Sequence, residues 1–583
     1  MNPDNETKFE EHIEKVLLDS PLYISRSPKN FDSARRVDPD MLWQFIYAQQ
    51  DIWKRLLNRF GTSEKVMDAV IKAYNTQLDN GISLVEILRN GLKVQGIPVK
   101  LMQPKPTLAG EDSALHQLYL ANRFAVVRQM RYSLDKEDKG NELDLCILIN
   151  GFPIITAELK NEGTGQNYTN GIYQYKHDRN PKNAMLRTVL VHFVVDNNYA
   201  FMTTKLDGKN TSFLPFNVDS VNPSVEGEYP TSYLWREIWQ ADSLLNIIEQ
   251  FVKSYTVKNK TVTIFPRYHQ LRAVRNLVKR VKEEGPGHNY LIKHSAGSGK
   301  TKSMAWLAHQ LVNLVNPDQT PVFDSIIMVT DRIVLNANMA EDVNNFATEA
   351  GVVKDIRRGS KKLAKAIDEG GRIIVSTVQK FSYALNTLKR EKRRKYAVII
   401  DEAHTAVGSE SAKDIVNALS TDEDIHNIAI EAGADEGIGE MDALMTYMQT
   451  MRRQMSHISY FAFTATPKDK TYALFGKKTA TGYEAHDEYT MKQAIDEKFI
   501  LDVLRSYTTY RTMFEYIEKN KPHQQMAMTT EGVVAEPEPD EYSRDKSVAL
   551  ILQKLNQEPE NMTLKARLAL KYFMEHTLSL IHI

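Results

Sequence analysis

The segment from His294 to Thr301 places the tightest constraint on how this chain can fold. It reads His-Ser-Ala-Gly-Ser-Gly-Lys-Thr, follows an apolar run and precedes an amphipathic pattern of helical period. A glycine-rich turn between a strand and a helix predicts a phosphate-binding loop, because its backbone N–H groups face phosphate oxygens. Lys300 would then reach the β- and γ-phosphates of ATP, and the Thr301 hydroxyl would ligate Mg²⁺. The alternative is a turn that binds no ligand. The expected nucleotide contacts are Ser295, Ala296, Gly297, Ser298, Gly299, Lys300 and Thr301.

Short apolar runs alternate with helical stretches around this loop, which predicts a parallel α/β sheet. The run that ends at Ile400 is followed by Asp401 and Glu402. An aspartate at the end of a strand beside a phosphate loop can hold Mg²⁺ through water, and the glutamate can orient the attacking water. The alternative is an ordinary helix start at a strand end. The predicted strands are Tyr290–Lys293, Ser325–Thr330, Arg372–Ser376, Tyr396–Ile400 and Tyr460–Phe463.

The residues before about 255 follow another pattern. Strand-like runs at 143–149 and 152–160 are separated by Asn150-Gly151, which predicts a β-hairpin. Two more strand-like segments follow. Amphipathic helices are predicted near 9–17, 41–57 and 64–75, and the later strands at 188–196 and 200–204.

The predicted hairpin carries three charged residues. Glu158 and Lys160 project from one face of a strand, and pairing can bring Asp144 beside them. Two carboxylates can hold Mg²⁺ against a phosphodiester while the lysine orients or activates water. The alternative is a solvated strand face with alternating charges. The pattern therefore predicts either a metal-dependent nuclease centre or an ordinary polar surface.

The loop and its neighbouring motifs resemble superfamily 2 helicases and translocases of the DEAD/H-box type. The resemblance rests on Gln270, His294–Thr301, Asp401–His404 and Thr464–Pro467, although His294 replaces the usual first glycine. It implies a RecA-like motor lobe in which Gln270 reads the adenine. It also makes Arg332 and Lys380 candidate contacts to nucleic-acid phosphates, the alternative being ordinary surface charge.

The hairpin residues Asp144, Glu158 and Lys160 resemble a PD-(D/E)xK nuclease, with Leu143 in place of the proline. One subgroup of that family has an accessory glutamine just downstream, with a tyrosine often four residues after it. Gln174 matches the glutamine, but Asp178 stands at the tyrosine position. The resemblance therefore leaves the roles of Gln174 and Asp178 open.

A PD-(D/E)xK nuclease followed by a DEAH-type motor lobe is similar to the restriction (R, HsdR-like) subunit of type I restriction-modification enzymes. The resemblance implies ATP-dependent translocation on double-stranded DNA and Mg²⁺-dependent cleavage of unmodified DNA. It also implies partner subunits for methylation and for sequence specificity. Two alternatives stay open: a repair or defence helicase with a non-catalytic nuclease-like module, and a nucleotide-dependent scaffold for methyltransferase partners.

The resemblance divides the chain into three α/β parts. They are an endonuclease domain at 1–255, an ATP-binding RecA-like lobe at 256–485, and a linker with the start of a second lobe at 486–583. Because no glycine follows Gly532 and the last six residues resemble a sequencing adapter, we expect a C-terminally truncated chain. Such a chain would bind ATP weakly and hydrolyse it poorly, since the second lobe supplies arginines to the ATP site.

Composition excludes several other classes of protein. Cys146 is the single cysteine, which excludes a disulfide framework and a cysteine-based zinc site in these 583 residues. Lysine plus arginine and aspartate plus glutamate both number 74, so nucleic-acid binding would depend on local patches. The sequence shows neither a signal peptide nor an apolar run of about 18 residues. We therefore expect a soluble cytoplasmic protein.

Overall fold

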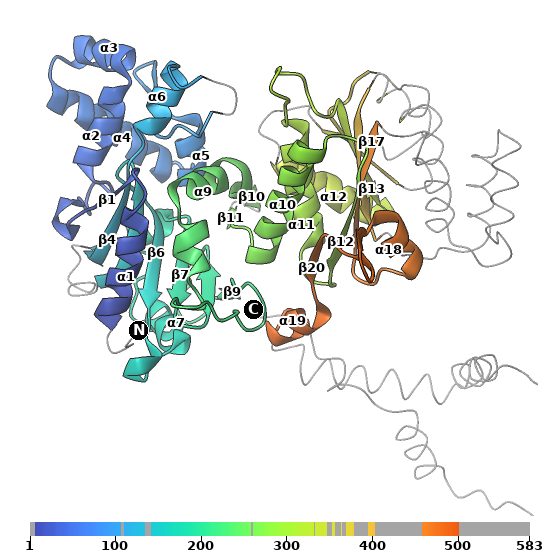
Figure 1. Cartoon of the computed structure of the whole chain (residues 1–583). Helices are drawn as coiled ribbons and strands as arrows, with labels where there is room; N and C mark the ends of the chain where they lie inside the picture. Colours follow the sequence, from blue (N-terminus) through green and yellow to red (C-terminus); the bar gives the residue numbers. More distant parts are fainter. Residues whose placement is uncertain are drawn as a thin grey trace, which may run out of the picture. The chain divides into compact units, whose positions relative to one another are not determined.

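Figure 1 shows the computed structural model of the chain. Residues 1–501 form one compact unit, and a second unit, 502–583, lies outside the described residues. The structure describes residues 6–106, 110–133, 142–257, 260–330, 333–346, 353–355, 363, 366, 369–377, 394–402 and 457–500.

The first seven-stranded sheet is mixed and has the order β1-β4-β5-β6-β7-β8-β9. The predicted hairpin is confirmed: β5 and β6 pair antiparallel through Asn150 and Gly151, whose φ angles are 47° and 91°. β6 then pairs parallel with β7. The strands are β1 (Tyr23–Ser25), β4 (Phe124–Arg131), β5 (Glu142–Ile149), β6 (Phe152–Leu159), β7 (Val191–Val195), β8 (Ala200–Thr203) and β9 (Leu214–Pro215).

The prediction of one helix across 41–57 is wrong, because the segment forms two helices that meet at Gln49. The Gln49 side chain accepts from the Lys100 N–H at 3.0 Å and donates to the Lys100 carbonyl at 2.8 Å. This distant contact fixes the chain where the first helix ends. The helices are α1 (Glu6–Leu18), α2 (Pro39–Ala48), α3 (Gln50–Phe60), α4 (Ser63–Asp79), α5 (Leu84–Asn90), α6 (Ala114–Leu120), α7 (Tyr168–His177) and α8 (Ala184–Thr188).

Several shorter elements complete this region and lead into the next. They are the ribbon of β2 (Leu92–Val94) and β3 (Ile97–Val99), the 3-10 turns η1 (Pro28–Asn30) and η2 (Glu162–Thr164), the π-helices η3 (Leu234–Ile238) and η4 (Ile247–Phe251), α9 (Ala241–Asn246), and the hairpin of β10 (Lys253–Val257) and β11 (Lys260–Ile264).

The second seven-stranded sheet is parallel throughout and has the order β14-β15-β13-β16-β17-β12-β20. All five strands predicted around the phosphate loop are present, so the predicted α/β class is confirmed. Sequence patterns did not indicate β14 or β20. The strands are β12 (Asn289–His294), β13 (Ser325–Thr330), β14 (Val353–Asp355), β15 (Ile373–Thr377), β16 (Tyr396–Asp401), β17 (Ile458–Thr464) and β20 (Asp487–Tyr489).

Helices connect these parallel strands. α10 precedes the phosphate-loop strand and α11 follows the loop directly. The elements are α10 (Tyr268–Glu284), α11 (Lys300–Val312), α12 (Ile333–Phe346), α18 (Asp469–Phe475), α19 (Met491–Asp496), and the hairpin of β18 (Lys477–Thr479) and β19 (Gly482–Glu484).

Buried side chains of both sheets belong to one hydrophobic cluster. Within it, the Trp306 indole of α11 donates to the Phe251 carbonyl of η4 at 2.7 Å. The predicted boundary at 255 falls inside β10, and β20 extends the second sheet past 485. The division into domains at 255 and 485 therefore stays a prediction.

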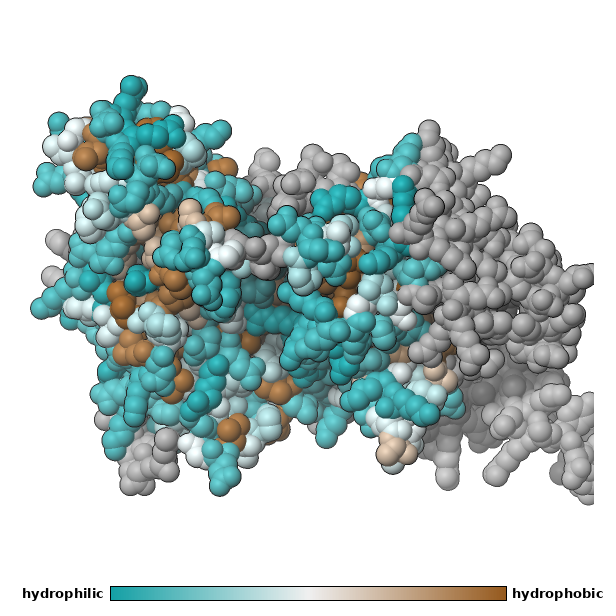
Figure 2. All heavy atoms as spheres, turned by 45° about the horizontal axis from the view of Figure 1, so that its top comes forward, coloured by the Kyte–Doolittle hydropathy of each residue, from teal (hydrophilic) through white to brown (hydrophobic). Residues whose placement is uncertain are grey.

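On the face drawn in Figure 2, hydrophilic side chains predominate and hydrophobic ones form small scattered patches. In the described part of the chain, no helix is both long enough and apolar enough to span a membrane.

Candidate functional site

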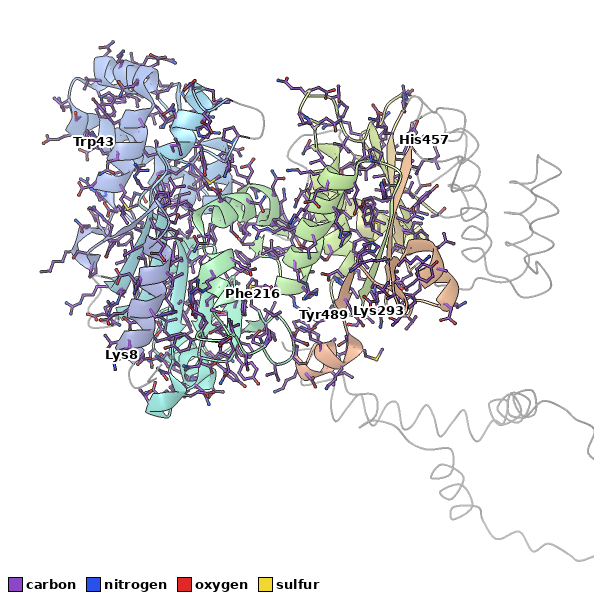
Figure 3. All side chains as sticks on the ribbon, in the orientation of Figure 1. Lys8, Trp43, Phe216, Lys293, His457 and Tyr489 are labelled. Atoms are coloured by element: carbon purple, nitrogen blue, oxygen red, sulfur yellow. The ribbon has the colours of Figure 1, made fainter. Side chains whose placement is uncertain are left out.

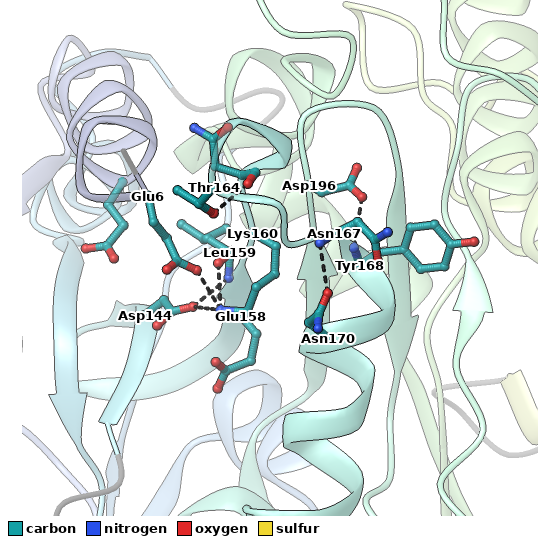
Figure 4. A network of polar contacts seen from close by, with 12 residues as sticks. Glu6, Asp144, Glu158, Leu159, Lys160, Thr164, Asn167, Tyr168, Asn170 and Asp196 are labelled. Atoms are coloured by element: carbon teal, nitrogen blue, oxygen red, sulfur yellow. Dashed lines mark hydrogen bonds and ion pairs between the residues drawn. The ribbon is translucent and has the colours of Figure 1, made fainter. Parts of the chain in front are cut away.

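The three charged residues of the predicted hairpin lie together in the structure. The Asp144 Oδ2 atom accepts from the Leu159 N–H at 2.8 Å and lies 3.3 Å from Lys160 Nζ. Lys160 Nζ also lies 2.6 Å from the Glu6 Oε1 atom of α1. Figure 4 shows Glu6, Asp144 and Lys160 converging beside β6. The alternative of a solvated strand face does not fit Glu158 and Lys160, which are 0% and 2% exposed.

Glu158 has the most constrained carboxylate in this cluster. Arg179 donates to its Oε1 from Nε at 2.9 Å and from a terminal nitrogen at 2.6 Å. The Oε2 atom is buried and has no hydrogen-bond partner within the described residues. Burial, with the charge of Asp144 added, raises the pKa of Glu158 to about 8, although Arg179 and Lys160 oppose the rise. Arg179 therefore holds one oxygen of the Glu158 carboxyl group, while the other has no hydrogen-bond partner among the described residues.

The lysine is held in its charged form. Burial of Lys160 acts to lower its pKa, but the carboxylates of Asp144, Glu6 and Glu158 outweigh that effect and raise it. A charged ammonium beside Asp144 suits orientation of a water or a phosphate oxygen.

Sequence reasoning missed Arg179. α7 ends at His177 and Asp178 caps it, so Asp178 is exposed while the next residue turns back toward the sheet. Arg179 is 7% exposed. Gln174 lies on α7 with a buried Oε1 for which the described residues supply no hydrogen-bond partner. The sequence signal for Arg179 was its position just after a helix. The direction of its side chain depends on the residue at which that helix ends.

Sequence reasoning also assigned Glu10 only to a helix. It is 3% exposed on α1, and it accepts from Gln129 at 2.7 Å and from Arg128 at 3.2 Å. Burial raises the pKa of Glu10 to about 7, with the nearby charge of Asp144 contributing. The cluster is therefore bordered by a carboxyl group that titrates near neutrality.

The carboxylates of Asp144 and Glu158 fit a Mg²⁺ ion. A buried carboxylate oxygen without a partner is costly unless a cation or a hydrogen-bond donor meets it. Mg²⁺ is commonly held by one or two carboxylates, with waters and substrate phosphates completing the octahedron. No group of three or more histidine, cysteine, aspartate or glutamate side chains arranged for a metal occurs among the described residues. The fit therefore rests on the carboxylates of Asp144 and Glu158 alone.

The phosphate loop has the conformation that its glycines predict. Gly297 and Gly299 adopt φ angles of 75° and 80°, and α11 begins at Lys300. Lys300 Nζ lies 3.0 Å from the Glu402 Oε1 atom and 3.3 Å from the His294 carbonyl. Asp401 is the last residue of β16 and is 7% exposed. The structure thus brings the loop lysine to Glu402, the residue that follows Asp401 at the end of β16.

Gln270 braces the loop from α10. Its Nε2 atom donates to the carbonyls of Ser298 and Gly299, both at 3.2 Å, while its Oε1 accepts from the Arg267 N–H at 3.0 Å. Gln270 is 4% exposed. Its amide is therefore engaged by the loop backbone, and the predicted role in reading adenine stays a prediction.

His294, which departs from the usual glycine, links the loop to β20. Its Nε2 atom lies 2.8 Å from the Asp487 Oδ1 atom, and Arg272 bonds the same carboxylate. Burial lowers the pKa of His294. Lys293 and Tyr489, labelled in Figure 3, lie on the two neighbouring strands. A histidine here serves to connect strands, which a glycine could not do.

Other predicted residues lie partly outside the described chain. Thr464 ends β17, and its Oγ1 accepts from the Thr466 N–H at 3.3 Å. Arg332, Lys380 and His404 fall on residues that the structure does not describe. The proposed DNA contacts therefore stay predictions.

Gly299→Ala is expected to damage the loop more than a matched glycine substitution elsewhere. A Cβ at Gly299 would lie 2.5 Å from the Gln270 Nε2 atom. It would displace that amide, whose hydrogen bonds contribute about 0.5 to 1.5 kcal/mol each. The positive φ adds about 1 to 2 kcal/mol. We expect a lower free energy of unfolding by denaturant and weaker ATP binding.

The control for that variant is Gly165→Ala. Gly165 is also left-handed, with φ 76° and ψ 12°, but nothing lies within 4 Å of the position that a Cβ would take there. This control should show only the backbone cost of about 1 to 2 kcal/mol and normal ATP binding. Equal losses of stability and of ATP affinity in Gly299→Ala and Gly165→Ala would contradict the bracing role of Gln270.

Two protein families match successive regions of the chain. Residues 8–211 match the N terminus of the type I restriction enzyme R protein, and residues 269–537 match the SWI2/SNF2 ATPase. The first region contains Asp144, Glu158 and Lys160, and the second contains the phosphate loop.

Curated relatives are endonuclease subunits of type I restriction enzymes. One from Staphylococcus aureus (strain MRSA252) is 26% identical over 333 residues, covering 52% of this chain and 32% of the relative. One from Staphylococcus saprophyticus is 23% identical over 433 residues, covering 69% and 39%. The chain thus spans about a third of the length of these relatives. A solved HsdR fragment from Vibrio vulnificus YJ016 has 15% identity and a TM-score of 0.25, covering 61% of this chain and 51% of the fragment.

Proposed function

We propose that this chain, which joins a type I restriction enzyme R protein N-terminal region to a SWI2/SNF2 ATPase region, is the restriction subunit of a type I restriction-modification complex. It would use ATP to translocate double-stranded DNA and Mg²⁺ to cleave DNA that lacks the protective modification. One observation carries the nuclease part of the proposal. The buried Glu158 presents an oxygen without a hydrogen-bond partner in the described chain, on the strand that pairs with the strand of Asp144.

In the proposed nuclease centre, Asp144 and Glu158 would hold Mg²⁺, and Lys160 lies next to Asp144. The bound cation would polarise the phosphodiester and stabilise the charge that develops on it. Lys160 donates hydrogen bonds to the attacking water or to a phosphate oxygen, a role that its 3.3 Å approach to Asp144 supports. For this, the Lys160 ammonium must exchange its contact with Glu6 for one with the substrate.

In the proposed motor site, Lys300 exchanges Glu402 for the nucleotide phosphates. Thr301 and Asp401 would hold the Mg²⁺ that accompanies ATP, and Glu402 would orient the attacking water. The 3.0 Å contact between Lys300 and Glu402 supports this exchange, because it shows that the lysine already lies beside a negatively charged oxygen. Binding of ATP would therefore change the partners of both residues.

The proposed partners follow from the same assignment. Modification and specificity subunits would supply methylation and sequence recognition, and the complex would act in the cytoplasm. Arg332 and Lys380 are proposed to contact DNA phosphates, which position a protein on DNA without reading its sequence. In this assignment the partner subunits carry out methylation and sequence recognition, and this chain supplies the motor and the nuclease.

The proposed cleavage is tested with the purified chain and covalently closed circular duplex DNA. We expect nicked or linear DNA to accumulate with Mg²⁺, and no cleavage in EDTA. Ca²⁺ should support binding without efficient cleavage, since it accepts a looser coordination than the octahedron of Mg²⁺. Intact circles in every reaction, at enzyme concentrations that saturate the DNA, would contradict the nuclease assignment.

Metal binding at this centre is expected to strengthen as the pH rises toward 8. The pKa of Glu158 is about 8, so below that value the carboxyl keeps a proton that the cation must displace. Affinity should increase about tenfold for each pH unit between 6 and 8. The measurement is a Mn²⁺ titration at several pH values without nucleotide. Glu158→Gln should remove the slope, and a flat profile in the unaltered chain would contradict the carboxyl's role.

The raised pKa of Glu158 also makes the stability of the folded chain depend on pH. Because the pKa of Glu158 rises from 4.5 to about 8 on folding, the folded chain keeps a proton that the unfolded chain loses. The contribution of the protonated Glu158 to the free energy of unfolding is fully present below pH 4.5. It is lost as the pH rises through 8. Bound metal should offset that loss.

A further inference from the structure

Arg179 connects the two strands that carry the proposed metal ligands. Its guanidinium donates twice to the Glu158 Oε1 atom of β6, at 2.9 and 2.6 Å. It also donates to the Glu142 carbonyl at 2.8 Å. Glu142 begins β5, two residues before Asp144. One buried side chain therefore contacts both the ligand on β6 and the backbone of the strand that carries the other ligand.

The two bonds from Arg179 fix the orientation of the Glu158 carboxylate. Both guanidinium nitrogens use the same oxygen, so the second oxygen stays without a hydrogen-bond partner among the residues described. A lysine would offer a single charged point, whereas a planar guanidinium holds a fixed fork. The positive charge also offsets part of the cost of burying a carboxylate that is 0% exposed.

The end of α7 places Arg179 in this position. The helix ends at His177, and the Arg179 N–H bonds to the Gln174 carbonyl at 3.2 Å, which closes the last turn. Gly171 lets the same helix lie close to the sheet. A Cβ there would lie 2.6 Å from Val194 and 3.5 Å from the Glu158 Cβ. The helix therefore delivers Arg179 directly beside Glu158.

We propose that Arg179 is a positioning residue of the nuclease centre, which holds Glu158 Oε1 so that Oε2 is presented to the divalent cation. This inference rests on the proposed function, because it assumes that Glu158 binds a cation. In this role Arg179 would act through Glu158 and would itself bind neither the cation nor the DNA. Partners that orient metal ligands typically contribute 10-fold to 100-fold in metal affinity.

The test measures Mn²⁺ binding to the full chain without nucleotide, from the electron paramagnetic resonance signal of free Mn²⁺. We compare the unaltered chain with Arg179→Gln, Arg179→Lys and Asp144→Asn. Arg179→Gln should weaken the Asp144-dependent binding about 10-fold to 100-fold, and Arg179→Lys should lie between that variant and the unaltered chain. Arg187→Gln is the control, since Arg187 is an exposed arginine on α8.

Thermal unfolding of each variant separates positioning from loss of the fold. If Arg179→Gln is folded and binds Mn²⁺ as tightly as the unaltered chain, the inference is wrong. If Arg179→Gln does not fold, Arg179→Lys decides: weaker binding supports the inference and unchanged binding overturns it. If the unaltered chain has no Mn²⁺ site that depends on Asp144, the proposed function fails and the inference fails with it.

A cleavage assay gives a second readout for folded variants. Positioning through metal affinity predicts that Arg179→Lys raises the Mg²⁺ concentration needed for half-maximal cleavage. At saturating Mg²⁺ this variant should recover much of the cleavage rate, because the proposed metal ligands Asp144 and Glu158 are intact. A lower rate at saturating Mg²⁺ with an unchanged half-maximal concentration would contradict positioning through the cation.

Discussion

Replacing Asp144 with asparagine is expected to reduce Mg²⁺-dependent DNA cleavage by more than about 100-fold and to leave the fold intact. Partners that only orient a metal ligand already contribute about 10-fold to 100-fold, so loss of a ligand's charge should exceed that range. Asparagine keeps an oxygen at nearly the same place. It can still accept from the Leu159 N–H, which lies 2.8 Å from Asp144 Oδ2. The variant thus removes charge without leaving that donor unpaired.

The measurement is the initial rate of cleavage of closed circular duplex DNA, with thermal unfolding as the check on the fold. Asp51→Asn is a matched control, because Asp51 is an exposed aspartate on α3. The control should cleave at the normal rate. Cleavage by Asp144→Asn within about threefold of the control, a margin below 1 kcal/mol, would exclude Asp144 as a metal ligand.

Replacing Lys300 with alanine is expected to weaken ATP binding by about 10-fold to 150-fold. A hydrogen bond between charged groups contributes about 1.5 to 3 kcal/mol, and each 1.4 kcal/mol corresponds to tenfold in affinity. Lys300 begins α11 directly after the loop and is 9% exposed. Its loss also removes the partner that lies 3.0 Å from Glu402.

Equilibrium titration with a fluorescent ATP analogue measures this effect. Lys302→Ala is the control, since Lys302 lies on the same helix and its Nζ is 3.7 Å from an Asp342 carboxylate oxygen. The control should bind the analogue normally. Equal affinity of Lys300→Ala and Lys302→Ala would show that the loop does not bind phosphates as proposed.

The elements that sequence patterns located correctly are governed by local chemistry. Asn150-Gly151 requires two positive φ angles and therefore marks the hairpin, and the strands beside the phosphate loop are continuous apolar runs. The break at Gln49 was missed, and it coincides with hydrogen bonds to Lys100, 51 positions away. Hydrophobic period alone cannot report such a contact.

The candidate sites show the same division. Alternation along β6 and pairing with β5 were sufficient to bring Asp144, Glu158 and Lys160 together. The partners of those residues could not be predicted, since Glu6 lies 154 positions from Lys160 in the sequence. Arg179 depends on where α7 ends, and helix ends are set by capping contacts that sequence patterns locate poorly. The structure thus adds the partners that hold the predicted site residues in place.

The central claim is that one chain carries two separable sites, a metal-dependent nuclease and a nucleotide-binding motor. The most direct test measures Mg²⁺-dependent cleavage of closed circular DNA and binding of the ATP analogue in parallel for Asp144→Asn and Lys300→Ala. We expect Asp144→Asn to lose cleavage but to bind nucleotide normally. We expect Lys300→Ala to bind nucleotide about 10-fold to 150-fold more weakly but to keep metal-dependent nicking. Normal cleavage by Asp144→Asn, or normal nucleotide binding by Lys300→Ala, would contradict the claim of two separable sites.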